Sequence, residues 1–181
     1  IYSHVLHKSV LGFKGLFLCH TDGKTQTLLD FSLHGEEGKN PEKKQGLTDK
    51  QRKARFSKKR YGDSAVNTRI KEYRQNKINR SIEMVRESIR RGIRFDYLLV
   101  DSWFTCADLL NFICSRHLKC HLIGMIKMGK TRYKTRFGNL NASDIIDRLK
   151  KEKSVRYSRK LNCHYAYIDA EYANRKIRIF F

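Results

Sequence analysis

The 181-residue chain has 39 Lys and Arg residues against 18 Asp and Glu residues, a formal net charge of +21, and 40% of its residues are hydrophobic. This length and apolar content suffice for one ordinary domain, or for one domain with an insertion. The positive charge favours a polyanionic partner, most simply nucleic acid. No run is long and apolar enough to span a bilayer and no signal peptide opens the chain, so we expect no membrane partner.

The five cysteines favour reduced thiols in a cytoplasmic protein over a disulfide framework, because their number is odd and no CxxC pair occurs. The first residue falls inside sequence that reads as structured, and the last residues form an apolar run, 177–181. We therefore expect the chain to be an internal piece of a longer protein.

The first predicted elements form a β-hairpin. Residues 10–18 and 26–33 are apolar enough for strands, and Asp22-Gly23 between them is a turn signal. A long basic loop is expected over about 36–65, where the sequence is polar and has little periodicity. Apolar residues at helical spacing then predict one helix over about 66–91, ended by Gly92, with one irregular step between Tyr73 and Ile78.

The middle of the chain predicts an α/β sheet. An apolar strand over 95–100 leads into a short loop, a helix with Thr105 as its N-cap, and a second strand over 121–126. The order helix–strand–helix–strand favours parallel pairing of the two strands. Two further strand-like runs, 162–170 and 177–181, follow a helical pattern over 141–151, which predicts a β-rich unit over 130–181 beside a core domain over 1–129.

Asp101 is the leading candidate for a functional residue. It directly follows an apolar strand that we expect to be buried, at the carboxyl end where α/β proteins place their sites. A carboxylate there either binds a metal ion or caps the following backbone, and its position alone does not decide between them. The basic surroundings favour Mg²⁺ or Mn²⁺ acting on nucleic acid, since phosphoryl transfer commonly uses carboxylate-held metal.

Several cations are candidate phosphate contacts. If the two central strands are parallel, Lys127 emerges from the same sheet edge as Asp101. Trp103 could stack on an unpaired base or cover the sheet. The remaining candidates are cations of the segment after residue 126 and of a basic arm in the predicted loop, and they are Lys130, Arg132, Lys134, Arg52, Lys53 and Arg55.

A second cluster, Cys114, His117, Cys120 and His121, has metal-binding residue types but unsuitable spacing. Structural zinc sites usually pair their ligands around tight turns, whereas these residues run from a helix into a strand. We therefore do not assign zinc here, nor a Cys–His nucleophile, which would need an orienting partner.

The segment Tyr97-Leu98-Leu99-Val100-Asp101-Ser102-Trp103-Phe104 resembles the DDE transposases of bacterial insertion sequences. The segment from His4 through Thr21-Asp22-Gly23 is similar to the hairpin after that family's first catalytic strand. The run 107–113 is similar to the helix after its second catalytic Asp.

The resemblance implies an RNase H-like mixed sheet with flanking helices and a β-rich insertion. It also implies metal-dependent cleavage and transfer of DNA strands, with transposon ends and target DNA as partners and a possible homodimer on DNA. Asp101 matches the second of three acidic metal ligands, the first being expected before residue 1 and the third beyond residue 181. The implied location is the bacterial cytoplasm, at the nucleoid. Two alternatives stay open, another RNase H-like nuclease of the resolvase or repair type, and a non-catalytic or decayed DNA-binding module.

Overall fold

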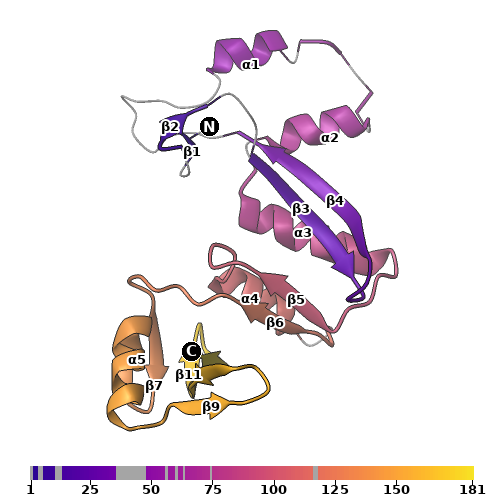
Figure 1. Cartoon of the computed structure of the whole chain (residues 1–181). Coiled ribbons are helices and arrows are strands. Elements are labelled where there is room, and N and C mark those ends of the chain that lie inside the picture. Colours follow the sequence, from indigo (N-terminus) through magenta and orange to yellow (C-terminus); the bar gives the residue numbers. More distant parts are fainter. Residues whose placement is uncertain are drawn as a thin grey trace. The chain divides into compact units, whose positions relative to one another are not determined.

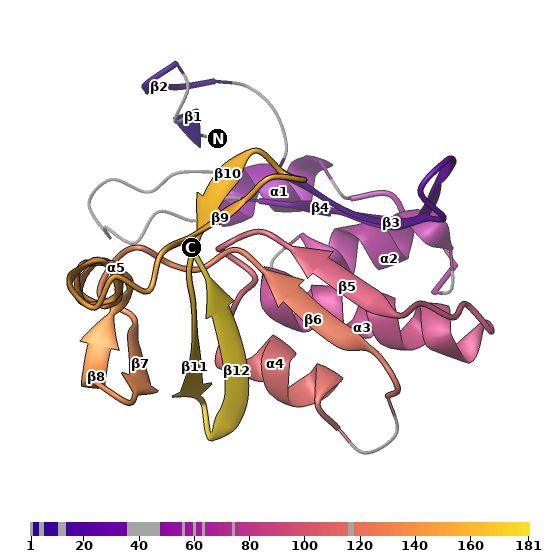
Figure 2. The same ribbon diagram turned by 60° about the horizontal axis from the view of Figure 1, so that its bottom comes forward.

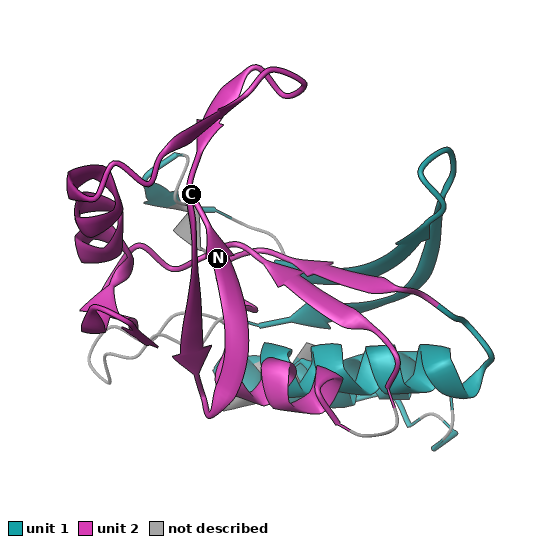
Figure 3. Ribbon diagram, turned by 90° about the horizontal axis from the view of Figure 1, so that it is seen from below, with its two compact units in different colours: residues 1–94 teal, residues 95–181 magenta. Residues whose placement is uncertain are grey.

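The computed structural model describes residues 2–3, 6–10, 14–35, 48–55, 57–59, 61–62, 64–73, 75–115 and 118–181. The chain divides into two compact units, residues 1–94 and 95–181, which Figure 3 colours separately. The domain boundary expected after residue 129 falls inside the second unit, and the functional division stays a prediction.

An antiparallel hairpin is the main sheet of the first unit (Figure 1). Strands β3 (Lys14–Thr21) and β4 (Gln26–His34) pair with a register shift between Leu18 and Cys19. Asp22 fixes the turn, because its Oδ1 accepts hydrogen bonds from the backbone N–H groups of Lys24 (2.9 Å) and Thr25 (2.7 Å). The predicted hairpin is confirmed. A short antiparallel pair, β1 (Tyr2–Ser3) and β2 (Lys8–Ser9), lies in the same unit.

The helix expected over 66–91 is two helices, α2 (Ala65–Glu72) and α3 (Lys77–Arg90). The break falls where the apolar spacing is irregular, and Asn76 begins α3 by accepting hydrogen bonds from the N–H groups of Ile78 and Asn79. Gly92 ends α3 as predicted. Its φ of +88° suits the left-handed turn that closes the helix.

The long loop expected over 36–65 is wrong in part, because residues 49–55 form the helix α1 (Asp49–Arg55). The helix begins with a reciprocal capping box, which the polar composition of the segment made hard to recognise in the sequence. The Thr48 N–H donates to Gln51 Oε1 at 3.0 Å, and the Gln51 N–H donates to Thr48 Oγ1 at 3.2 Å. Residues 36–47 lie outside the described residues.

The second unit begins with a parallel strand pair, β5 (Tyr97–Val100) and β6 (His121–Gly124), against which α4 (Ala107–Ile113) packs. The parallel pairing is confirmed, but two details are wrong. The strand β5 is not buried, since Tyr97 and Leu99 are 58% and 64% exposed. The N-cap of α4 is Cys106 rather than Thr105.

The rest of the second unit is a four-stranded sheet with the strand order β12-β11-β7-β8, accompanied by the helix α5 (Figure 2). Its elements are β7 (Arg132–Thr135), β8 (Gly138–Asn141), α5 (Ala142–Lys151), β11 (Tyr167–Tyr172) and β12 (Arg175–Phe180), with a separate hairpin of β9 (Arg156–Ser158) and β10 (Cys163–Tyr165). Ile145 and Leu149 of α5 pack with Tyr133, Ile168 and Ile179 of the sheet in one buried core. This part of the chain is β-rich, as predicted.

The mixed α/β class is confirmed. The described strands make five small sheets, and an RNase H-like sheet is not formed among them. Within the described residues, no helix is both long and apolar enough to cross a membrane.

Candidate nucleic-acid interface around Asp101

The parallel register brings Asp101 and the segment after β6 to one sheet edge. Val100 pairs with Gly124, and the N–H of Met125 donates to the carbonyl of Val100 at 3.2 Å. Asp101 and Met125 are therefore the first residues beyond the paired strands, and both leave at the carboxyl end. The strand β6 ends at Gly124 rather than at residue 126, so Lys127 is the third residue beyond the paired strands, and its place at this edge stays a prediction.

The side chain of Asp101 holds a tight turn. Its Oδ1 accepts hydrogen bonds from the N–H groups of Trp103 (2.8 Å) and Phe104 (3.2 Å), and Thr105 Oγ1 donates to its carbonyl at 2.9 Å. Such a turn is a common role for Asp. The carboxylate is exposed, and its Oδ2 has no hydrogen bond or ion pair within the described part of the chain. One oxygen thus organises the backbone while the other faces solvent.

Gly124 lets the Asp101 turn approach the end of β6. A Cβ at this position would lie 2.4 Å from Thr105 Oγ1 and 3.2 Å from Val100 Cγ2. Because a Cβ cannot stand 2.4 Å from Thr105 Oγ1, a larger residue here would shift Thr105 in the turn that carries Asp101.

Asp101 by itself does not make a metal centre. Among the described residues no group of three or more His, Cys, Asp and Glu side chains is arranged to hold an ion. Mg²⁺ is bound through carboxylates together with waters and substrate phosphates, so Asp101 Oδ2 could supply one ligand. Further carboxylates would have to come from outside this set, and the residues present do not fit a complete site.

The cations predicted to contact phosphate differ in their surroundings. Lys127 is half-buried, whereas Lys130 is exposed. In β7, Arg132 and Lys134 flank the buried Tyr133 and therefore point to the opposite, exposed face. Arg132 Nη1 donates to the carbonyl of Asn139 at 3.0 Å, and Lys134 Nζ lies 3.4 Å from a carboxylate oxygen of Glu171. Lys130 is thus the least constrained of the four.

Trp103 is 68% exposed, so it does not cover the sheet. Its indole stands immediately beside the Asp101 turn, where it is accessible to a base or another ring. The neighbouring Phe104 is half-buried.

The basic arm lies on α1. Lys53 is exposed on that helix, and the side chains of Arg52 and Arg55 lie outside the described set. His117 also lies outside the described residues, so the Cys114–His121 cluster is described only in part. Burial and the neighbouring Cys114 raise the pKa of the Cys120 thiol, which disfavours its thiolate.

A buried ionic cluster of the first unit was not predicted from sequence. Arg80 on α3 forms ion pairs with Asp30 Oδ2 (2.7 Å) and Glu72 Oε1 (2.9 Å), and Arg69 forms ion pairs with Asp30 Oδ1 (3.1 Å) and Glu72 Oε2 (2.8 Å). Arg69 also donates to the Phe31 carbonyl and lies 4.2 Å from the centroid of the Phe31 ring. Glu83 adds a longer ion pair to Arg80, at 3.6 Å. The cluster joins β4 to α2 and α3, and each of its two buried carboxylates is held by both guanidinium groups.

No family model matches this chain, and no match was found among curated proteins or solved structures.

Proposed function

We propose that this chain is part of a DNA transposase of the DDE type, with an RNase H-like catalytic core. In this proposal Asp101 is one of the acidic metal ligands. The transposase resemblance rests on the segment 97–104 and the helix that follows it. The alternative of another RNase H-like nuclease has the same core chemistry and differs in its DNA substrate.

One observation carries the proposal. An exposed carboxylate follows one strand of a parallel pair at its carboxyl edge, and the segment that follows the neighbouring strand carries Lys127 and Lys130. Active sites of α/β sheets form at such edges. A carboxylate beside cations suits a reaction on a phosphodiester, because the cations hold the strand while the carboxylate binds a divalent ion.

The residues of this chain would bind and position DNA. Lys127, Lys130, Arg132 and Lys134 would contact phosphates of the strand being cut, and Trp103 would stack on an exposed base. Mg²⁺ or Mn²⁺, when bound, would supply the charge that promotes phosphoryl transfer. The turn made by Asp101 Oδ1 would keep the other carboxylate oxygen directed outward. A homodimer on DNA, acting at the bacterial nucleoid, remains part of this proposal.

A second candidate function is DNA binding without catalysis. It is favoured by the role of Asp101 as a turn cap and by the absence of a metal-binding cluster among the described residues. It needs only the basic surface, and it predicts that divalent metal has no effect on DNA.

Two measurements test these proposals. Affinity of the chain for duplex DNA should fall by roughly 10³–10⁵ between about 50 and 200 mM salt if some 6–10 phosphates are contacted. An affinity that does not change with salt would contradict both functions. Cleavage of DNA carrying transposon ends by the natural full-length protein, dependent on Mg²⁺ or Mn²⁺, would support the transposase. Binding without cleavage would favour the second candidate.

A further inference from the structure

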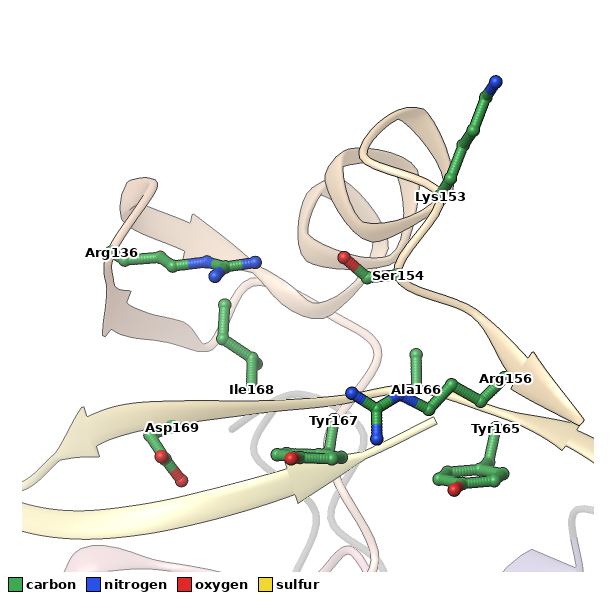
Figure 4. A pocket seen from close by; sticks show the side chains of 9 residues that line it. All are labelled: Arg136, Lys153, Ser154, Arg156, Tyr165, Ala166, Tyr167, Ile168 and Asp169. Atoms are coloured by element: carbon green, nitrogen blue, oxygen red, sulfur yellow. The ribbon is translucent and has the colours of Figure 1, made fainter. Parts of the chain in front are cut away.

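A cavity of about 420 Å³ lies in the second unit between the end of α5, the β7–β8 turn and the strands β9 to β11 (Figure 4). It lies in the β-rich part of the chain, and neither Asp101 nor the cations proposed to hold DNA line it. Its lining includes three basic residues, a serine and two tyrosines, namely Arg136, Lys153, Arg156, Ser154, Tyr165 and Tyr167.

Two guanidinium groups converge on this cavity. Figure 4 shows Arg136 and Arg156 directed into it from opposite sides, whereas Lys153 points away. Arg136 is held by an ion pair with Glu152 (2.5 Å) and by the Phe137 ring, 4.7 Å from its guanidinium carbon. Arg156, by contrast, has no hydrogen bond or ion pair within the described residues. An anion between the two guanidinium groups would give Arg156 a partner.

Two tyrosine rings also line the cavity, and Figure 4 shows them on the side of the strand opposite to Ile168 and Ala166. Tyr165 is the cross-strand partner of Arg156 in the β9–β10 hairpin, so the register itself places a ring beside this guanidinium. Tyr167 on β11 is 40% exposed, its ring packs against Phe180 at a centroid distance of 5.8 Å, and the guanidinium carbon of Arg178 lies over one face of the ring, 5.0 Å from its centroid. Aromatic faces beside cations are the usual surroundings of a bound nucleobase.

The carboxylate of Asp169 also lines the cavity, but it should repel a bound anion only weakly. Both oxygens of Asp169 are bound by Arg178, at 2.7 and 3.1 Å, and this ion pair holds the pKa of Asp169 below its ordinary value. Its negative charge is therefore compensated by Arg178, as the positive charge of Arg136 is by Glu152, and Arg156 remains as the inward-pointing cation without a partner among the described residues.

We propose that this cavity binds a nucleoside phosphate, with the phosphate between Arg136 and Arg156 and the base against Tyr165 and Tyr167. A bare phosphate would leave the rings unused, and the volume falls in the range of small-molecule pockets. The ligand is either a free nucleotide or an unpaired nucleotide of a DNA strand, because both present the same groups. This inference does not depend on the proposed transposase activity.

The test compares two variants that each remove one positive charge from the same segment. Arg156→Gln removes the guanidinium that points into the cavity, and Lys153→Gln removes the charge that points away. Binding of dAMP, deoxyadenosine and inorganic phosphate is measured by calorimetric titration at low salt, with melting curves to confirm folding. We expect dAMP to bind more tightly than the other two ligands. Arg156→Gln should weaken dAMP binding about tenfold or more, and Lys153→Gln by about twofold or less.

A second arm distinguishes the two sources of the nucleotide. Duplex DNA with a short single-stranded overhang is compared with the same duplex blunt-ended. A preference for the overhang that Arg156→Gln abolishes and Lys153→Gln preserves would identify a strand as the source, even if dAMP itself is not bound. The proposal is overturned if neither dAMP nor the overhang is preferred, or if both variants weaken binding equally, since surface charge alone would explain that result.

Discussion

Asp30 on β4 and Arg80 on α3 are fifty positions apart in the chain, yet a carboxylate oxygen and a guanidinium nitrogen of the two residues lie 2.7 Å apart. Arg80 is nine-tenths buried and shares this environment with Glu72, which is as deeply buried. Removing one partner from such a cluster leaves uncompensated charge in the interior, and this usually costs more than the pair itself contributes.

Arg80→Met should therefore lower the free energy of unfolding of the first unit by about 3–5 kcal/mol. Arg91→Met is a matched control, because the side chain of Arg91 is 71% exposed and its ion pair with Glu87 is long, at 3.9 Å. We expect the control to change stability by less than about 1 kcal/mol. Urea denaturation gives the free energy of unfolding of both variants. Equal, small decreases would show that the buried cluster contributes no more to stability than an exposed ion pair does.

Stability of the first unit should decrease as the pH is lowered below about 6.5, the ordinary pKa range of histidine. His34 is buried, its Nδ1 donates to the Gln75 carbonyl (3.1 Å) and its Nε2 bonds with Ser32 Oγ (2.7 Å). Burial lowers its pKa, so the unfolded chain takes up a proton at a higher pH than the folded one. His34→Asn should abolish the decrease between about pH 7.5 and 5. A melting temperature that falls equally in both proteins would assign the effect to other groups.

The turn of Asp101 should be sensitive to the residue at the end of β6. Gly124→Ala introduces a methyl group that meets Thr105 Oγ1, and we expect it to cost about 1–3 kcal/mol. Thr105→Ala in the same chain should recover part of that loss, because it removes both Thr105 atoms that the new methyl group meets and leaves the 3.2 Å approach to Val100 Cγ2. A double-mutant cycle measures the coupling. Strictly additive effects would mean that the two positions do not touch.

Lys130→Glu should weaken binding of duplex DNA and reduce the slope of log affinity against log salt by about 1. Lys130 is exposed and follows β6, so the fold should tolerate the change. Lys24→Glu in the β3–β4 turn is a control with the same change of charge. Filter binding or fluorescence anisotropy over a salt series gives both slopes, and equal slopes for the two variants would remove Lys130 from the interface.

Local signals in the sequence were sufficient for the elements that depend on near neighbours. Asp22-Gly23 predicted the hairpin, Gly92 the end of α3, and the apolar runs before Asp101 and Lys127 the parallel pair. The sequence also contains signals for the break before α3, namely the irregular apolar spacing from Tyr73 to Ile78 and the capping residue Asn76. The helical periodicity on both sides nevertheless suggested one helix. Likewise Thr48 and Gln51 carry a capping box inside a segment whose polarity suggested a loop.

Contacts between distant residues could not be predicted in this way. Whether Asp30 meets Arg80 depends on how the hairpin packs on α3, and whether Arg136 and Arg156 share a cavity depends on the β9–β10 register. Asp101 shows the same limit for function. Its position after a strand indicated either a cap or a metal ligand, and its Oδ1 is seen to cap a turn while its Oδ2 remains exposed.

The central claim, that Asp101 serves DNA cleavage, is tested most directly by Asp101→Asn in the natural full-length protein. Asn keeps the oxygen that accepts the N–H groups of Trp103 and Phe104 but removes the charge that a metal needs. We predict that the melting temperature is nearly unchanged, DNA affinity is equal or slightly higher, and Mg²⁺-dependent strand cleavage is abolished. Asp101→Ala should lose cleavage as well as about 0.5–2 kcal/mol of stability. Cleavage retained by the folded Asp101→Asn variant would contradict the catalytic assignment.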